Sequence, residues 1–161
     1  MGSGTDRPTV VMEWHEKLEM FTGPQGGPAL RFGAIAWALA PMVELSLRTS
    51  GLKATMRRVE RLSMPTAPRS WAIEGDLAER LVARAFRAHL GLRGLCLERS
   101  LVQWATHRLA GTRARLVSGV RKEEASDAKV AAHAWVELGD EQAERDDGYT
   151  TIYDGADDLR A

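Results

Sequence analysis

The chain has 161 residues, 44% of them apolar, which is enough for one compact domain with a sizeable core. Lysine plus arginine and aspartate plus glutamate number 22 each, so the formal net charge is zero. This balance argues against nucleic acid as a partner and against attachment to an anionic membrane, because both use an excess of basic charge. The single cysteine excludes an internal disulfide. With four scattered histidines it also lacks the spacing of a metal site, so neither a metal nor another cofactor is expected.

Two loop-like stretches divide the chain into three parts. Residues 22–28, "TGPQGGP", and residues 63–70, "SMPTAPRS", are rich in glycine or proline, which interrupt helices. We therefore expect a flexible segment over 1–28, a helical segment over 29–62 and a C-terminal domain over 70–161.

The helical segment contains the longest apolar stretch, "FGAIAWALAPMV" over residues 32–43. This stretch is shorter than the roughly 20 residues that a membrane-spanning helix needs, so no membrane span and a cytoplasmic location are expected. The residues from 48 to 69 are basic, with one acid, Glu60, among Arg48, Lys53, Arg57, Arg58, Arg61 and Arg69. They predict either a solvated helix face or a docking surface for an acidic peptide or partner.

The C-terminal domain reads as two helices followed by three strands. Hydrophobic periodicity and end signals predict helices over 74–90 and 96–109, the second ending before Gly111. Alternation and β-branched residues predict strands over 113–120, 129–138 and 148–153. Two helices that precede an antiparallel sheet indicate an α+β fold.

Cys96 begins the second of these helices. On a helical wheel it lies on a polar arc, opposite an apolar arc that includes Leu97, Leu101 and Trp104, and its companions are Arg99, Ser100, Gln103, Thr106 and His107. In the first turn, free backbone N–H groups and the helix dipole favour a thiolate and would stabilise an oxyanion on an attacked carbonyl. The alternative is a small residue packed at a helix start.

A nucleophilic thiol needs a base within hydrogen-bond reach. His107 lies eleven residues along the same helix, about 16 Å away, and His15 lies outside the domain. His89 at the end of the first helix has a ready explanation as a charge near a helix C-terminus. His133 is the better candidate, because strand alternation places it on one face with Trp135 and Glu137. The alternative is a histidine that only packs on Trp135.

A third group should accept the other N–H of the imidazole, and a carboxylate on the next strand would supply it. Asp146 or Asp147 would open that strand, and we favour Asp146. Asp140 belongs to an expected turn, where aspartate is common for conformational reasons alone.

Two blocks of the domain carry a family pattern. The first starts "CLERS" at Cys96 and reaches Gly119 and Val120, and the second is "HAWVE" over 133–137. Together they resemble the stand-alone leader peptidases of lasso-peptide biosynthesis, which belong to the transglutaminase-like cysteine protease superfamily. The likeness is sharpest over 91–138 and weaker over 29–62. It implies a papain- or transglutaminase-like fold, in which the catalytic cysteine begins a helix packed on an antiparallel sheet and an N-terminal helical segment precedes them.

The resemblance implies a Cys-His-Asp triad with Cys96 as nucleophile, His133 as base and an aspartate near Asp146. The residues after Leu138, "GDEQAERDD", depart from the family pattern, so Asp140, Asp146 and Asp147 stay open as the third member. The implied reaction removes the leader from a ribosomally made precursor peptide, so that a separate cyclase can close a macrolactam ring. The chain is too short to hold a leader-recognition domain as well, which implies a separate leader-recognition protein and, as a further partner, the cyclase.

Two other functions use the same features. A transglutaminase or amidase would apply the same triad to a different acceptor, and fold and triad do not separate these activities. A non-catalytic adaptor would keep the fold and bind a peptide without cutting it.

Overall fold

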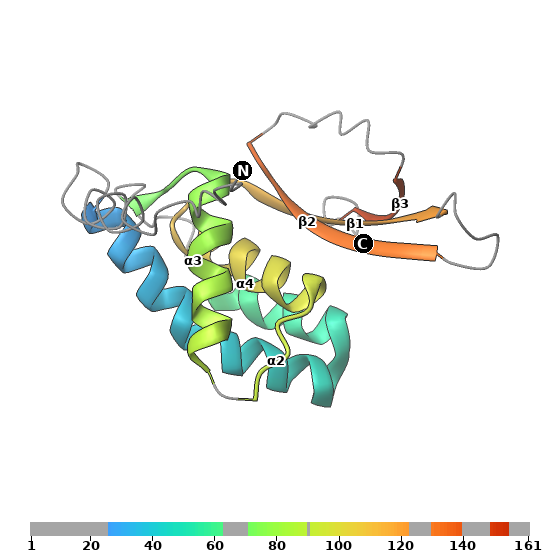
Figure 1. Cartoon of the computed structure of the whole chain (residues 1–161), viewed down its shortest axis with the longest axis horizontal. Coiled ribbons are helices and arrows are strands. Elements are labelled where there is room, and N and C mark those ends of the chain that lie inside the picture. Colours follow the sequence, from blue (N-terminus) through green and yellow to red (C-terminus); the bar gives the residue numbers. More distant parts are fainter. Residues whose placement is uncertain (1–25, 63–70, 90, 123–129, 140–148, 155–161) are drawn as a thin grey trace, which may run out of the picture.

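The computed structural model describes residues 26–62, 71–89, 91–122, 130–139 and 149–154 (Figure 1). The order of elements is α2 (Gly26–Leu62), α3 (Gly75–Ala88), α4 (Cys96–Leu109), β1 (Ala114–Lys122), β2 (Val130–Leu138) and β3 (Thr150–Asp154). The predicted α+β class is confirmed, with helices followed by a small antiparallel sheet. The five elements predicted in the C-terminal domain are all present, with ends shifted by at most two residues, and β1 continues past Gly119 and Val120 to Lys122.

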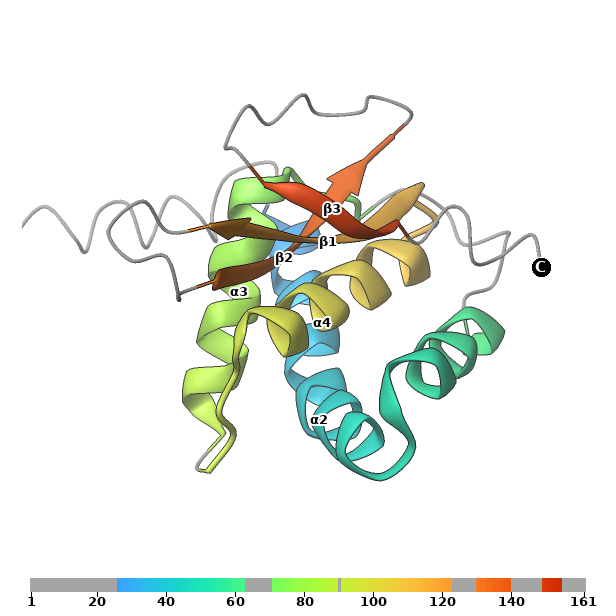
Figure 2. The same cartoon turned by 90° about the vertical axis from the view of Figure 1, so that its right-hand side faces the viewer.

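Helix α2 starts at Gly26, three residues before the predicted start at residue 29. Proline is tolerated in the first helical turn, where its missing N–H has no intrahelical acceptor, so Pro28 does not block this start. Gly51 has φ 76° and ψ 177°, which breaks the helix into two limbs that turn back on one another (Figure 2). The Thr55 hydroxyl donates to the Gly51 carbonyl oxygen at 2.8 Å and satisfies a backbone group that the break exposes.

The expectation of no membrane span rested on the length of the apolar stretch, and that reason does not hold. The stretch is part of a longer helix, and Gly26–Arg61 is long and apolar enough to cross a bilayer. A third of its most apolar window is buried inside the fold, and core helices of soluble proteins meet the same criterion. The fold is therefore compatible with a soluble domain.

The main core lies where α2, α3 and α4 meet. Each helix contributes one apolar face, and the largest buried side chains include Phe32 from α2, Val82 from α3, and Leu101 and Trp104 from α4. The Trp104 indole N–H donates to the Ala114 carbonyl oxygen at 3.1 Å, which ties the end of α4 to the start of β1. Helix α4 therefore lies between the other helices and the sheet.

The sheet has the strand order β2-β1-β3, and both pairs are antiparallel. Leu116 on β1 pairs with Val136 on β2, and both belong to the helical core, so their shared face looks toward the helices. The neighbouring pair, Val117 and Trp135, lies on the opposite face. Figures 1 and 2 show the described helices on one side of the sheet. Among the described strands, β2 lies at one edge of the sheet, and β1 separates it from β3.

Candidate active site

One cavity of about 220 Å³ contains both main candidate residues. It lies where the start of α3, the start of α4 and strand β2 approach one another. Its lining comprises Gly75, Asp76, Glu79, Cys96, Arg99, Ser100, Gln103, His133, Ala134, Trp135 and Val136. Four consecutive residues of β2 line it, as expected for a cavity that runs along an open strand edge and is reached from both sheet faces. The fold therefore brings Cys96 and His133 to one site from 37 residues apart in the sequence.

Cys96 is the first residue of α4, and its side chain is exposed. The N-cap residue, Leu95, provides no side-chain hydrogen bond to the first turn. The first backbone N–H groups of an uncapped helix are available to an anion, whether this is the thiolate or an oxyanion that develops next to it. The local geometry matches the predicted helix start.

Gly94 explains how the chain enters α4 at this point. Its φ of 55° lies in the left-handed region, which glycine adopts without a steric penalty. A Cβ at this position would lie 2.9 Å from the ring of Phe86, a buried residue of α3. The absent side chain therefore lets the backbone pass close to α3 near the end of that helix, two residues before Cys96.

His133 lies on β2, opposite Gly119 of β1, and is exposed. Its ring centroid is 6.1 Å from that of Trp135, with an 18° angle between the planes, and 5.8 Å from that of Tyr149. Within the described part of the chain, no hydrogen bond joins His133 to Cys96. Catalytic hydrogen bonds are often long in a free enzyme and tighten when substrate binds, so this apo geometry leaves the pair intact as a candidate.

The sites of the thiol and the imidazole are tied together by a third residue. The Ser100 hydroxyl, one turn after Cys96, donates to the backbone carbonyl oxygen of Ala134 at 2.7 Å. Ala134 follows His133 directly on β2. This buried hydrogen bond fixes the start of α4 against the strand that carries the histidine.

The predicted polar arc of α4 is only partly a polar surface. Cys96 and Arg99 are exposed, but Ser100, Thr106 and His107 are buried, because the sheet and two other helices surround α4. The Thr106 hydroxyl donates to the Val102 carbonyl oxygen at 2.7 Å. A helical wheel groups residues by polarity alone and does not show how many neighbouring elements pack around the helix.

His107 belongs to the core and not to the site. It is 0% exposed, and its ring lies edge-on to Phe32 with the centroids 5.0 Å apart. Neither ring nitrogen has a hydrogen-bond partner among the described residues. Burial lowers the pKa of His107 from 6.5 to about 4, because the charged ring would lose its hydration.

The other two histidines are also placed. His89 stacks on Trp37 of α2 with centroids 4.7 Å apart, and its Nε2 lies 2.8 Å from the Trp37 carbonyl oxygen. It does not line the cavity, so the structure gives it a packing role at the end of α3. His15 lies outside the described residues.

The three candidates for the third triad member, Asp140, Asp146 and Asp147, lie outside the described residues. The expectation that the next strand would bring a carboxylate beside His133 meets one difficulty, since β3 pairs with β1 and not with β2. Tyr149, just before β3, nevertheless reaches the His133 ring across β1. Within the described ranges, no group of three or more histidine, cysteine, aspartate or glutamate residues is arranged to hold a metal ion.

Sequence analysis missed the part of the site that α3 supplies. Asp76 and Glu79 line the cavity beside Arg99. Asp76 is an acid in the first turn of α3, where it suits the helix dipole, and that local signal gives no hint of the neighbouring cavity. Their spacing of three residues places both on one helix face, which was the available clue.

A cysteine at the start of a helix that packs on an antiparallel sheet is the papain-like and transglutaminase-like arrangement. The family model described as "Transglutaminase-like superfamily" matches residues 39–154, which is most of the chain. The chain therefore belongs to the transglutaminase-like superfamily, whose members are generally cysteine proteases or transferases. No curated protein and no solved structure matches it.

Proposed function

We propose that the protein is a cysteine peptidase that removes the leader from a ribosomally synthesised lasso precursor peptide. The observation that carries this proposal is that Cys96, at an uncapped helix start, and His133 line one cavity. The superfamily supports cysteine-dependent acyl transfer. The substrate class rests on the resemblance of the "CLERS" and "HAWVE" blocks to lasso leader peptidases.

The reaction needs three steps from these residues. The Cys96 thiolate attacks the carbonyl carbon at the junction of leader and core, and the first N–H groups of α4 bind the resulting oxyanion. The His133 imidazolium then gives its proton to the leaving amine of the core as the peptide bond breaks. Water, deprotonated by His133, hydrolyses the thioester and releases the leader. Asp146 is the proposed acceptor for the other imidazole N–H.

The cavity shape is consistent with a peptide substrate. Among the described strands β2 lies at an edge of the sheet, and its outward backbone groups, apart from the Ala134 carbonyl oxygen that accepts from Ser100, can pair with an extended chain. Arg99 offers a cationic group on one side of Cys96, while Asp76 and Glu79 offer anionic groups from α3. A peptide laid along β2 would pass the thiol with charged groups of both signs beside it.

We also propose that a separate leader-recognition protein delivers the precursor, and that it contacts the basic stretch 48–69. A second cavity, of about 320 Å³, lies between the limbs of α2. Its walls are apolar, with Leu39, Met42 and Val59 among them, and Arg58 and Arg61 also line it. Such a surface suits an acidic amphipathic segment. The macrolactam cyclase, which would receive the freed core, is a further proposed partner, and the proposed location is the cytoplasm.

The test is mass spectrometry of a lasso precursor peptide incubated with the protein, with and without the leader-recognition protein. We expect two products whose masses sum to that of the precursor plus one water, and Cys96→Ala should yield none while its circular dichroism is unchanged. Cleavage by folded Cys96→Ala would contradict the proposal.

The same experiment distinguishes the alternative functions. A transglutaminase acting through Cys96 would release ammonia from a side-chain amide and attach an amine in its place, and an amidase would release ammonia and add water; both change the mass without cutting the chain. A peptide-binding adaptor would retain the precursor at its original mass.

A further inference from the structure

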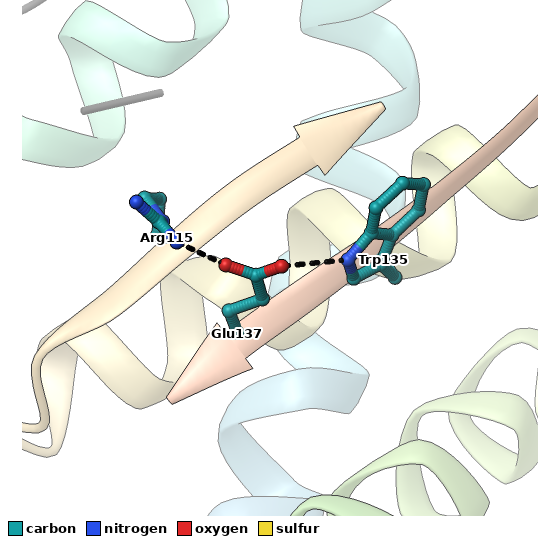
Figure 3. Close-up of polar contacts among 3 residues, drawn as sticks. All are labelled: Arg115, Trp135 and Glu137. Carbon is teal, nitrogen blue, oxygen red and sulfur yellow. Dashed lines mark hydrogen bonds and ion pairs between the residues drawn. The ribbon is translucent and has the colours of Figure 1, made fainter. Parts of the chain in front are cut away.

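A buried carboxylate lies on the sheet face that is remote from the helices. Glu137 is 7% exposed, and both of its oxygens are used (Figure 3). Oε1 accepts a hydrogen bond from the Trp135 indole N–H at 3.1 Å, and Oε2 forms an ion pair with Arg115 of β1. These residues link β1 and β2 through one acidic group.

Stability is a weak reason to bury such a group. Removing a carboxylate and a guanidinium from water costs several kcal/mol, and apolar residues of similar size often replace a buried ion pair without loss. What the pair provides here is a fixed geometry. Glu137 can accept from Trp135 only when the indole lies along the strand toward it, so the hydrogen bond selects one orientation of that ring.

Gly119 supplies the space for this orientation. A Cβ at Gly119 would lie 3.1 Å from the far edge of the Trp135 ring and 3.0 Å from the Thr150 carbonyl oxygen. The indole therefore lies over the bare backbone of β1. Since Gly119 pairs with His133, the space it leaves is directly beside the imidazole.

The orientation of Trp135 sets that of His133. The imidazole stacks on the indole at 6.1 Å, and Tyr149 lies at 5.8 Å from it. The Tyr149 ring also contacts Trp135, at 6.2 Å, and carries the Arg121 guanidinium 4.8 Å from its centroid. Among the described residues the imidazole contacts aromatic rings and forms no hydrogen bond, so a shift of the indole would turn it.

We propose that Arg115, Glu137 and Trp135 form a positioning network that orients the His133 imidazole toward Cys96. The proposal rests on the proposed function, in which His133 pairs with the thiol. None of the three is a catalytic residue, because their effect passes through the histidine. Loss of Arg115 or Glu137, which do not line the cavity, should lower kcat by about 10- to 100-fold and leave KM nearly unchanged, as expected for a displaced catalytic group.

The test uses iodoacetamide, which reports the reactivity of the only thiol and needs no substrate. The rate of Cys96 alkylation is measured on the full chain at pH 6, where a free thiol of pKa about 8.5 is almost entirely protonated. His133→Ala defines the rate without the imidazole. The alkylation rates of Glu137→Ala and Trp135→Ala should be at least tenfold lower than that of wild type and approach the rate of His133→Ala. Glu137→Gln keeps an acceptor oxygen and should stay closer to wild type.

A second readout separates positioning from folding. The NMR resonance of the His133 ring proton is displaced by the currents of the neighbouring rings, so it should move in Glu137→Ala and stay in Glu137→Gln. Leu116→Val is the matched control, because Leu116 adjoins Arg115 but faces the helices; it should lower the unfolding free energy and leave both the rate and the resonance unchanged. Where Glu137→Ala does not fold, Trp135→Phe, which keeps a ring but loses the N–H, should show both changes more weakly.

Two outcomes are distinct failures. If folded Glu137→Ala, or Trp135→Phe in its place, reacts like wild type with an unmoved His133 resonance while His133→Ala is slow, the positioning network is refuted and the proposed function stands. If His133→Ala itself reacts like wild type, the proposed pairing of thiol and imidazole is refuted. The His133 resonance alone then tests the network, and an unmoved resonance in folded Glu137→Ala refutes the network as well.

Discussion

His107 and His133 are the same type of side chain in two different environments, the helical core and the edge of the sheet. His107 is enclosed by the helical core, against Phe32, where burial lowers its pKa to about 4. His133 lies exposed at the edge of the sheet, between aromatic rings and beside the cavity that holds Cys96. The core keeps the His107 imidazole uncharged and out of contact with water, whereas the sheet edge keeps the His133 imidazole oriented and accessible. Proton transfer needs the second environment, because a base must reach both thiol and water.

The two regions are joined by short connections. The left-handed Gly94 places Cys96 beside α3, and Ser100 ties α4 to β2. A change in the sheet edge should therefore affect reactivity, a change in the core should affect stability, and a change in the connections should affect both.

The largest effect should come from the proposed third triad member, whose proposed role is to orient the exposed His133. Asp146→Asn should lower kcat for leader removal by about 10⁴-fold with little change in stability, because the imidazole loses the carboxylate that selects its tautomer. Steady-state kinetics on Asp140→Asn, Asp146→Asn and Asp147→Asn in parallel provide the measurement. A loss confined to Asp140→Asn or Asp147→Asn would move the role to that residue.

Gly94→Ala should disturb the connection that leads from α3 into α4. The new Cβ would meet the Phe86 ring and force a residue with φ 55° into strain, so the unfolding free energy should fall by about 2–4 kcal/mol. Denaturant unfolding measures the change. Gly91→Ala is the control, since Gly91 also has a positive φ, 91°, but open space around it. Equal losses in both variants would show that the contact with Phe86 does not set the entry to α4.

The core histidine should make stability depend on pH. Its folded-state pKa of about 4 lies below the unfolded value of 6.5, so its contribution is present above pH 6.5 and is lost as pH falls toward 4. Between pH 7 and pH 5 the unfolding free energy should fall by about 2 kcal/mol, because the unfolded state gains a proton first.

His107→Phe should remove most of this slope, as measured by denaturant unfolding at both pH values. His133→Ala is the matched control and should leave the slope in place. If the slope persists in His107→Phe, the buried imidazole is not its source.

The smallest effect should come from Ser100→Ala. It removes one buried hydrogen bond and leaves the Ala134 carbonyl oxygen without this donor, which should cost about 1–2 kcal/mol of unfolding free energy. Thr106→Ala is the control, because its hydroxyl bonds within α4 and does not reach the sheet. Cys96 alkylation should slow in Ser100→Ala alone, and equal alkylation rates in the two variants would argue against a role for this tie in aligning the site.

Periodicity predicted the described elements well. The start of α4 at Cys96 and the alternation that groups His133, Trp135 and Glu137 both follow from local patterns, which a single sequence carries. Helix α2 starts before the expected residue 29, because proline fits the first turn of a helix and the glycine- and proline-rich stretch does not exclude one there.

Features that depend on distant contacts could not be predicted. The burial of His107 depends on Phe32, 75 residues earlier, and the ion pair of Glu137 depends on the register of β1 against β2. The central position of β1 is likewise a property of strand order. The acidic run after Leu138 contains several equivalent aspartates, so its local pattern does not select one.

The most direct test of the central claim, that Cys96 and His133 act as a pair, is the rate of iodoacetamide alkylation as a function of pH in wild type and in His133→Ala. We predict that the wild-type thiol stays reactive down to about pH 6, and that the variant's reactivity declines there as a free thiol of pKa about 8.5 does. Superimposable profiles for the two proteins would contradict the account.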